Sequence, residues 1–176
     1  AIAATFADLR AAGAVYEEGG AVWLRSTDHG DDKDRVLVKS DGQPTYLMPD
    51  VAYHRDKFAR AERLVNVLGA DHHGYVARMH AAMSVLGHDP EDLQVVITQL
   101  VNLLKDGREV RLSKRTGEMI ELADVVNEVG ADAARFPYLL LSVDSAQTFD
   151  MDLVASQVNE NPVFYVQYAH ARIHSV

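Results

Sequence analysis

The sequence predicts an α/β fold in which crossover helices connect the strands of a parallel sheet. From residue 49 onward, short apolar runs typical of buried strands alternate with segments of helical periodicity. The 176 residues are 48% hydrophobic, which is enough apolar material to bury a sizeable core. No apolar run reaches the roughly 18 residues of a membrane-spanning helix, so we expect no membrane partner.

The N-terminal part predicts a short helix followed by a small β-hairpin region. A helical pattern covers residues 6–12, and residues 21–25 and 35–39 have the composition of short strands. The turn between the strands, residues 28–34, holds four aspartates. Because the ligand spacing and closing glutamate of a calcium loop are missing, we interpret it as a solvated turn. Residues 45–48 are expected to be extended.

The middle of the chain shows the clearest alternation of helix and strand. Pro49 and Asp50 open a predicted helix that runs to about Arg63, because proline suits the first turn and a carboxylate suits its positive end. Residues 64–68 predict a strand that is apolar enough to be buried on both faces. The predicted elements that follow are a polar loop at 69–75, an amphipathic helix at 76–86 and a strand at 94–101.

The remaining elements are predicted to be mainly helical. One helix covers residues 122–129, and Asp132 can cap another, which Pro137 should kink or shorten. Asn161 and Pro162 supply a cap and a first-turn proline for the last helix. The apolar stripe of this helix consists of Val163, Val166, Ala169 or His170, and Ile173.

Charge and cysteine content exclude several classes of protein. The absence of cysteine excludes a disulfide scaffold and any zinc site with thiolate ligands, and it fits a reducing compartment. The net charge of −9 argues against loose, non-specific binding to nucleic acid. However, residues 105–115 hold five basic and two acidic residues, a local charge of +3. This run is either a solvated loop or a localised anion-binding patch.

Polar side chains gather in loops at or near strand ends, where ligands bind in an open parallel sheet. Tyr46 and Asp50 could together accept hydrogen bonds from a planar guanidinium. The alternative is that Asp50 caps its helix and Tyr46 is an aromatic residue at the edge of the core. In the next loop, Gly69 would let a nucleotide approach the backbone and Asp71 could bind ribose, unless this loop merely caps the following helix.

Residues 109–117 predict an anion-binding loop. Lysine, arginine, serine and glycine lie close together there, and such groups can surround a polyphosphate as charge develops during phosphoryl or nucleotidyl transfer. The spacing of a P-loop is absent. A metal site at the adjacent His72 and His73 is disfavoured, because neighbours in sequence rarely converge on one ion and no third ligand follows.

Four motifs in order resemble those of the bacterial type of arginyl-tRNA synthetase, a class I aminoacyl-tRNA synthetase. Residues 111–115, Arg-Leu-Ser-Lys-Arg, are similar to the Lys-Met-Ser-Lys-Ser signature of that class. The other three motifs lie at residues 46–58, 69–75 and 167–172, so the resemblance runs from about residue 15 to the end. It implies a partial Rossmann-like sheet: residues 1–155 as the C-terminal part of the catalytic domain, and 156–176 as the start of the helical anticodon-binding domain.

The resemblance also implies a role for each site residue and a set of partners. Arginine, ATP and tRNA(Arg) would be the substrates, with Mg²⁺ accompanying ATP and no metal ligand assigned in this chain. The implied arginine-binding residues are Tyr46, Asp50 and His72. The implied ATP-binding residues are Gly69, Asp71, His72 and Lys114. Those implied to act in catalysis, by steadying the phosphates, are Arg111, Ser113, Lys114 and Arg115. The implied tRNA-binding residues are Tyr165, Tyr168 and Arg172.

Three departures from the family pattern matter. Arg111 replaces the first lysine of the signature, Pro137 stands where the family usually has an aromatic residue, and the His-x-Gly-His signature is absent from these residues. We therefore expect this chain alone not to aminoacylate tRNA. We also expect a cytoplasmic, monomeric parent enzyme, and self-association of the isolated segment through uncovered apolar surface. The competing hypotheses are a non-catalytic nucleotide- or RNA-binding module, and a class I synthetase for another amino acid.

Overall fold

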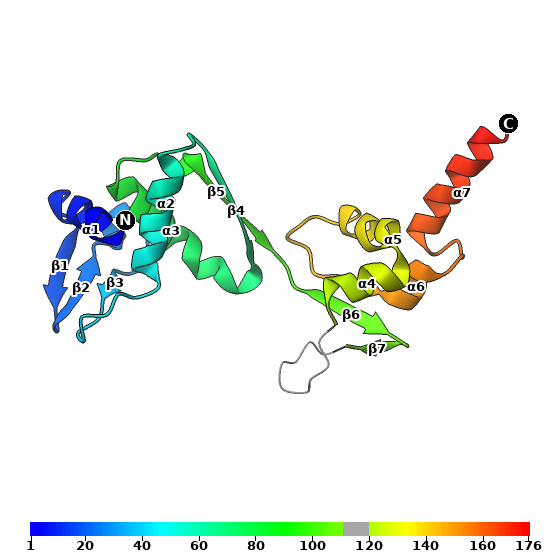
Figure 1. Ribbon diagram of the computed structural model, residues 1–176, viewed down its shortest axis with the longest axis horizontal. Helices are drawn as coiled ribbons and strands as arrows, with labels where there is room; N and C mark the ends of the chain where they lie inside the picture. The colour runs from blue at the N-terminus through cyan, green and yellow to red at the C-terminus, as the bar shows by residue number, and fades with distance from the viewer. Residues whose placement is uncertain (111–119) are drawn as a thin grey trace. The chain divides into compact units, whose positions relative to one another are not determined.

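A computed structural model describes residues 1–110 and 120–176. The chain divides into two compact units, Ala1–Ile97 and Thr98–Val176 (Figure 1), and each is described by itself. The two units divide between Ile97 and Thr98, so this division does not correspond to the predicted domain boundary near residue 156, which stays a prediction.

The first unit begins with a helix and a three-stranded antiparallel sheet. Helix α1, Ile2–Ala11, starts four residues earlier than predicted. The sheet has the order β1 (Val15–Glu18), β2 (Ala21–Leu24) and β3 (Arg35–Val38). The predicted strands correspond to β2 and β3, whereas β1 was missed because its second half is two glutamates. Gly19 and Gly20, both with positive φ, form the turn that pairs β1 with β2.

The predicted extended segment 45–48 is wrong in its second half. Helix α2 spans Leu47–Phe58, and Leu47 and Met48 are buried in its first turn. Pro49 is therefore the third helical residue, where its missing N–H still costs no helical hydrogen bond. The helix also ends five residues before the predicted Arg63.

The rest of the first unit follows the predicted strand–helix–strand order. The prediction that both faces of the first of these strands are buried is wrong, because Val65 and Val67 are 62% and 65% exposed. Strand β4 (Leu64–Gly69) is a hydrogen-bonded neighbour of β5 (Leu93–Thr98), and helix α3 (His73–Val85) connects them. Short 3₁₀ turns lie at Ala70–His72 and Pro90–Asp92. A single core joins the two sheets of this unit and its three helices. Its fully buried members include Leu9, Leu24, Leu37, Met48, Val51, Met79, Met83 and Leu93.

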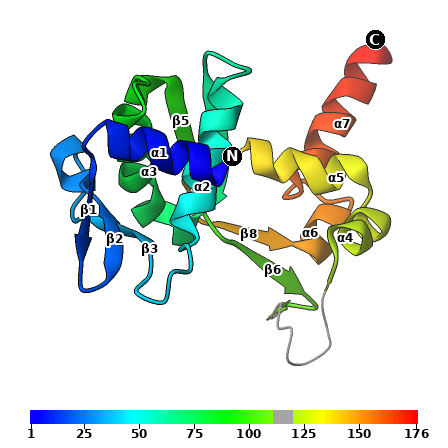
Figure 2. The same cartoon turned by 60° about the vertical axis from the view of Figure 1, so that its left-hand side comes forward.

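The second unit contains the directly observed parallel pairing. Strands β6 (Val101–Lys105) and β8 (Gln147–Asp150) run parallel, as Figure 2 shows, and β7 (Arg108–Glu109) pairs antiparallel with β6. The predicted strand 94–101 is thus corrected: it is the greater part of β5 followed by the first residue of β6. The helices are α4 (Leu122–Val129), α5 (Ala131–Arg135), α6 (Met151–Ala155) and α7 (Pro162–His174).

Of the predictions at helix ends in this unit, two are confirmed and one is wrong: Asp132 does not cap α5, because the N-cap residue is Gly130 and Asp132 lies inside the helix. Helix α5 ends at Arg135, and Pro137 lies in the 3₁₀ turn Phe136–Leu139 that replaces its continuation. Asn161 caps α7: its Oδ1 accepts the N–H of Val163 at 3.0 Å. The core of the unit is centred on Phe149, and its other buried members are Val125, Ala133, Met151, Val154 and Val163. Within the described residues, every helix is too short or too polar to cross a membrane.

Candidate amino-acid and nucleotide site

A cavity of about 680 Å³ in the first unit is formed by α2, β4 and the start of α3. It brings together the three residues that the resemblance implies for arginine binding: Tyr46, Asp50 and His72. The remaining lining residues are Leu47, Tyr53, His54, Lys57, Val65, Asn66, Val67, Leu68, Tyr75 and Arg78. Most of this lining is apolar, and the charged groups are few, which is typical of a site for one small polar ligand.

Asp50 and Tyr46 are available to a ligand. The residue at the N-cap position of α2 is Tyr46, and no side chain caps this helix end, so the interpretation of Asp50 as a helix cap is wrong. The Tyr46 side chain is 97% exposed, so it is not an aromatic residue at the edge of the core. The Asp50 side chain remains 38% exposed and lies in the first turn, where the helix dipole favours an anion.

A chain of polar side chains lies directly behind Asp50. His54, one turn further along α2, is buried, and its Nδ1 is 2.8 Å from the backbone oxygen of Asp50. The other ring nitrogen, Nε2, is 2.6 Å from Nδ2 of Asn66 on β4. Lys57 Nζ donates to Oδ1 of the same Asn66 at 3.1 Å. Burial lowers the pKa of His54, so the ring is neutral near pH 7.

Tyr75 contributes a half-buried group next to Asp50. Burial, reinforced by the nearby carboxylate of Asp50, raises the pKa of the Tyr75 phenol well above its usual range. The phenol therefore stays protonated and can only be a neutral hydrogen-bonding neighbour of the carboxylate. Its ring lies 6.3 Å from the rings of both His54 and His72, so it connects the two histidines of the cavity.

The predicted nucleotide loop follows β4 and borders the cavity. Gly69 is not in a left-handed conformation; its lack of a side chain matters because a Cβ would lie 3.0 Å from Oδ1 of Asp71. The Asp71 side chain is 83% exposed and its Oδ1 lies 3.7 Å from Nε2 of His72. Of the three, only His72 lines the cavity, whereas Gly69 and Asp71 lie beside it on the same loop.

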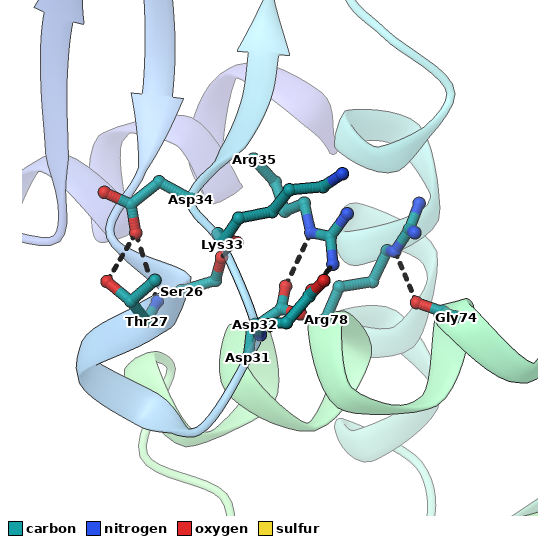
Figure 3. A network of polar contacts seen from close by, with 9 residues as sticks. All are labelled: Ser26, Thr27, Asp31, Asp32, Lys33, Asp34, Arg35, Gly74 and Arg78. Atoms are coloured by element: carbon teal, nitrogen blue, oxygen red, sulfur yellow. Dashed lines mark hydrogen bonds and ion pairs between the residues drawn. The ribbon is translucent and has the colours of Figure 1, made fainter.

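The acidic turn before β3 is not simply solvated, which corrects the prediction. The Asp31 side chain is fully buried and binds Arg35 through two hydrogen bonds, of 2.7 Å to Nε and 2.6 Å to Nη2 (Figure 3). Burial by itself would raise the pKa of Asp31, but hydrogen bonds from Arg35 and from the Asp32 backbone hold it well below its usual range. His29 of this turn lies 3.1 Å from the hydroxyl of Ser84, which ties the turn to α3.

The turn therefore supports the helix that carries one wall of the cavity. Arg78, whose side chain lines the cavity, donates from Nε to the backbone oxygen of Gly74 at 2.8 Å in the first turn of α3 (Figure 3). The 3₁₀ turn at Ser26–His29 packs against α3, so the segment that holds the buried ion pair also contacts the helix that carries one wall of the cavity.

The signature loop lies outside the described residues. Arg111, Ser113, Lys114 and Arg115, predicted to contact phosphates, all belong to residues 111–119. Residues 105–110, which precede this loop, belong to the part of the chain that the structure describes. There Nζ of Lys105, at the end of β6, binds Oε2 of Glu128 in α4 at 2.7 Å. Part of the positive charge counted in the sequence is therefore paired within the second unit.

The three residues predicted to bind tRNA lie exposed on α7. Tyr165 and Tyr168 are 57% and 49% exposed, and Arg172 donates to the hydroxyl of Tyr168 at 3.1 Å. Only Val163 of the predicted apolar stripe is buried, whereas Val166 and Ile173 are exposed. Packing of the whole stripe within this chain is therefore not observed.

The residues that surround Asp50 in the cavity were not predicted from the sequence. His54 and Lys57 have a detectable signal, because they follow Asp50 at +4 and +7 and therefore share its helix face. Asn66 has another, since it is the one polar residue of an otherwise apolar predicted strand. Tyr75 has no signal that separates it from an ordinary core aromatic. Among the described residues, no three acidic, histidine or cysteine side chains gather as a metal site.

Comparison with known proteins gives one consistent result. Residues 1–173 match the family described as the catalytic domain of class I tRNA synthetases (R). Arginine–tRNA ligases of Geobacillus kaustophilus and Bacillus subtilis are 56% and 55% identical over 169 residues, covering 96% of this chain and 30% of theirs. The chain thus spans less than a third of the length of these relatives.

Solved structures agree with the sequence comparison. A crystal structure described as that of an arginyl-tRNA synthetase from Campylobacter jejuni superposes with a TM-score of 0.88 at 43% identity, over 99% of this chain and 38% of that one. The arginyl-tRNA synthetase of Thermus thermophilus has a TM-score of 0.75 at 20% identity, over 99% of this chain and 39% of that one. The second similarity shows a shared fold.

Proposed function

Because this chain belongs to the catalytic-domain family of class I arginyl-tRNA synthetases, we propose that the full-length protein containing it is an arginine–tRNA ligase. It activates arginine with ATP and transfers the arginyl group to tRNA(Arg). The observation that carries this proposal is the cavity in which Tyr46 and Asp50 meet, with the Asp50 carboxylate capping no helix and open to solvent.

Asp50 and Tyr46 recognise the side chain of the amino acid. A carboxylate can accept two parallel hydrogen bonds from a guanidinium, and the Tyr46 hydroxyl can accept a further one. Lysine, whose ammonium is a compact point charge, cannot satisfy the same planar arrangement. The pocket therefore selects arginine by shape as well as by charge. His72, which also lines the cavity, contacts the amino acid or the nucleotide.

ATP binds along the loop that follows β4. Gly69 lets the nucleotide approach the backbone, and the exposed Asp71 carboxylate accepts hydrogen bonds from the ribose hydroxyls. Mg²⁺ enters with ATP: this ion is bound mainly through substrate phosphates and water, with one or two carboxylates, and needs no cage of protein ligands. Asp71, whose side chain is 83% exposed, would be the nearest carboxylate on this loop for such an ion.

The chemistry depends on position and electrostatics. The carboxylate of arginine attacks the α-phosphorus of ATP, an O–P bond forms, and the bond to pyrophosphate breaks. Ser113 and Lys114, with Arg111 and Arg115 nearby, steady the phosphates as negative charge moves to the leaving group. These four residues lie in the signature loop, so their role rests on the sequence resemblance alone.

The last helix starts a domain that binds tRNA. Residues 156–176 begin the helical anticodon-binding domain, and the exposed Tyr165, Tyr168 and Arg172 of α7 face the tRNA. The full-length protein works as a monomer in the cytoplasm, where tRNA is charged. The isolated chain self-associates, because apolar residues such as Val65, Val67 and Leu139 are more than half exposed.

Amino-acid-dependent exchange between ATP and pyrophosphate tests the proposal. The full-length protein, assayed with tRNA(Arg) present, should exchange with arginine and not with lysine, leucine or cysteine. Exchange with another amino acid only would assign a different class I specificity. Calorimetry that detects RNA binding, without binding of arginine or ATP, would replace the proposal with a non-catalytic RNA-binding module. If the proposal is correct, calorimetry detects arginine binding to the parent protein and Asp50→Ala abolishes it.

A further inference from the structure

The side chains behind Asp50 form a hydrogen-bond chain with only one consistent direction. An ammonium group has donors and no acceptor, so Lys57 must meet the carbonyl oxygen of Asn66. The amide nitrogen of Asn66 then faces Nε2 of His54, which must be the unprotonated acceptor. The ring proton is consequently on Nδ1, where it is donated to the backbone oxygen of Asp50.

These hydrogen bonds connect the two walls of the cavity. Lys57, His54 and Asp50 lie on α2, whereas Asn66 lies on β4. Because His54 is only 2% exposed and sits between the walls, its two hydrogen bonds set the distance of the Asp50 turn from the strand. Both of its ring nitrogens are satisfied, which is what a buried polar side chain requires.

The direction of these hydrogen bonds also determines the charge of the His54 ring. Nδ1 of His54 lies 3.9 Å from Oδ1 of Asp50, close enough for an ion pair if the ring were doubly protonated. With Nε2 occupied by a donor from Asn66, a second ring proton has no acceptor to receive it. The imidazole therefore stays uncharged, and the carboxylate is left without an internal cation on that side.

We infer that Lys57, Asn66 and His54 are positioning residues for arginine recognition: they place Asp50 and keep its negative charge available for the guanidinium. This inference rests on the proposed function, because it assumes that Asp50 binds the arginine side chain. None of the three needs to touch the reacting atoms. The groups facing His54 from the surrounding elements are Asp50, Tyr53 and Lys57 of α2, Asn66 of β4 and Tyr75 of α3.

The substitution Asn66→Asp tests the inference with almost no change in shape. A carboxylate at this place offers Nε2 an acceptor instead of a donor, so His54 takes up a second proton and becomes a cation 3.9 Å from Asp50. In exchange assays of the full-length protein, we expect the KM for arginine to rise at least tenfold. The kcat and the KM for ATP should stay within twofold of the parent protein, and the arginine defect should grow as the pH falls from 8 to 6.

Matched variants separate positioning from loss of structure. Asn127→Asp makes the same chemical change at an exposed position of α4 and should leave both KM values unchanged. Lys57→Met removes the donor that orients Asn66 and should raise the KM for arginine, whereas Lys57→Arg restores a donor and should recover most of the affinity. Thermal unfolding of each variant shows whether the fold is retained.

The outcome of a parallel Asp50→Asn variant keeps the two proposals distinguishable. If Asp50→Asn leaves arginine binding intact, the proposed pocket is wrong. If Asp50→Asn loses arginine binding while Asn66→Asp keeps the KM for arginine within twofold at every pH, only the positioning role is overturned. Equal increases in the KM for arginine and ATP after Asn66→Asp would also overturn it, since they would indicate general damage to the cavity.

Discussion

Removing one partner of the buried ion pair between Asp31 and Arg35 should destabilise the first unit. The side chains of the two residues are 0% and 12% exposed, so Asp31→Asn leaves a guanidinium that water can barely reach. Loss of one partner from a buried pair typically costs about 3–5 kcal/mol. Here the cost should be about 2–3 kcal/mol, because the introduced amide oxygen still accepts one hydrogen bond and Asp32 remains a second, exposed partner of Arg35.

Denaturant unfolding of the 176-residue chain measures this loss. Asp41→Asn is the matched control: its partner Lys39 is 3.8 Å away and both side chains are more than half exposed, so it should cost less than about 0.5 kcal/mol. The double variant Asp31→Leu with Arg35→Met should lose less than the sum of the single variants, since no buried charge is left unpaired. A cost below about 1 kcal/mol for Asp31→Asn would show that Arg35 does not depend on the buried carboxylate.

Three further outcomes are expected. Burial lowers the folded-state pKa of His54 below its ordinary 6.5, so the contribution of the neutral ring to the free energy of unfolding should be complete above pH 6.5 and be lost as the pH falls through the folded pKa. In His54→Gln, the free energy of unfolding should therefore decrease less steeply as the pH falls below 6.5, and a decrease identical to that of the parent chain would contradict this. Gly69→Val should raise the KM for ATP by crowding Asp71, and an unchanged KM would exclude the close approach. Asn161→Ala should cost about 2 kcal/mol in denaturant unfolding, because the buried amide caps α7 and donates to two backbone carbonyls; a cost below about 0.5 kcal/mol would show that the cap is dispensable.

The elements predicted best are those with signals at both ends. Helix α4 occupies the predicted residues 122–129, because its apolar period is regular and Gly130 stops it. Helix α2 has no such stop signal: residues 59–63 are good helix formers, and the chain leaves the helix after Phe58 before entering β4. Strand β8 was missed because Gln147–Asp150 is mostly polar, and only its pairing with β6 makes it a strand.

The residues of the site also differ in whether the sequence could predict them. That Tyr46, Asp50 and His72 lie around one cavity could be predicted, since the sequence resemblance assigns all three to one ligand; Tyr46 and Asp50, however, belong to the start of α2 and not to a strand end. The buried partners could not be predicted, because the contact between His54 and Asn66 depends on how α2 packs against β4. The aspartates before β3 show the limit most clearly. Their composition is that of a solvated turn, yet a guanidinium four residues later allows Asp31 to be fully buried.

The arrangement of the site predicts binding without turnover for the isolated chain. Residues 46–75, which form most of the proposed guanidinium pocket, lie within one compact unit with its own core, so we expect arginine to bind weakly to the isolated chain. The His-x-Gly-His signature of class I synthetases is absent from the chain, and the chain spans only 30% of the length of its relatives. We therefore expect calorimetry to detect arginine binding that Asp50→Ala removes, while a tRNA-charging assay detects no product. Measurable charging by the isolated chain would show that its own residues suffice for catalysis.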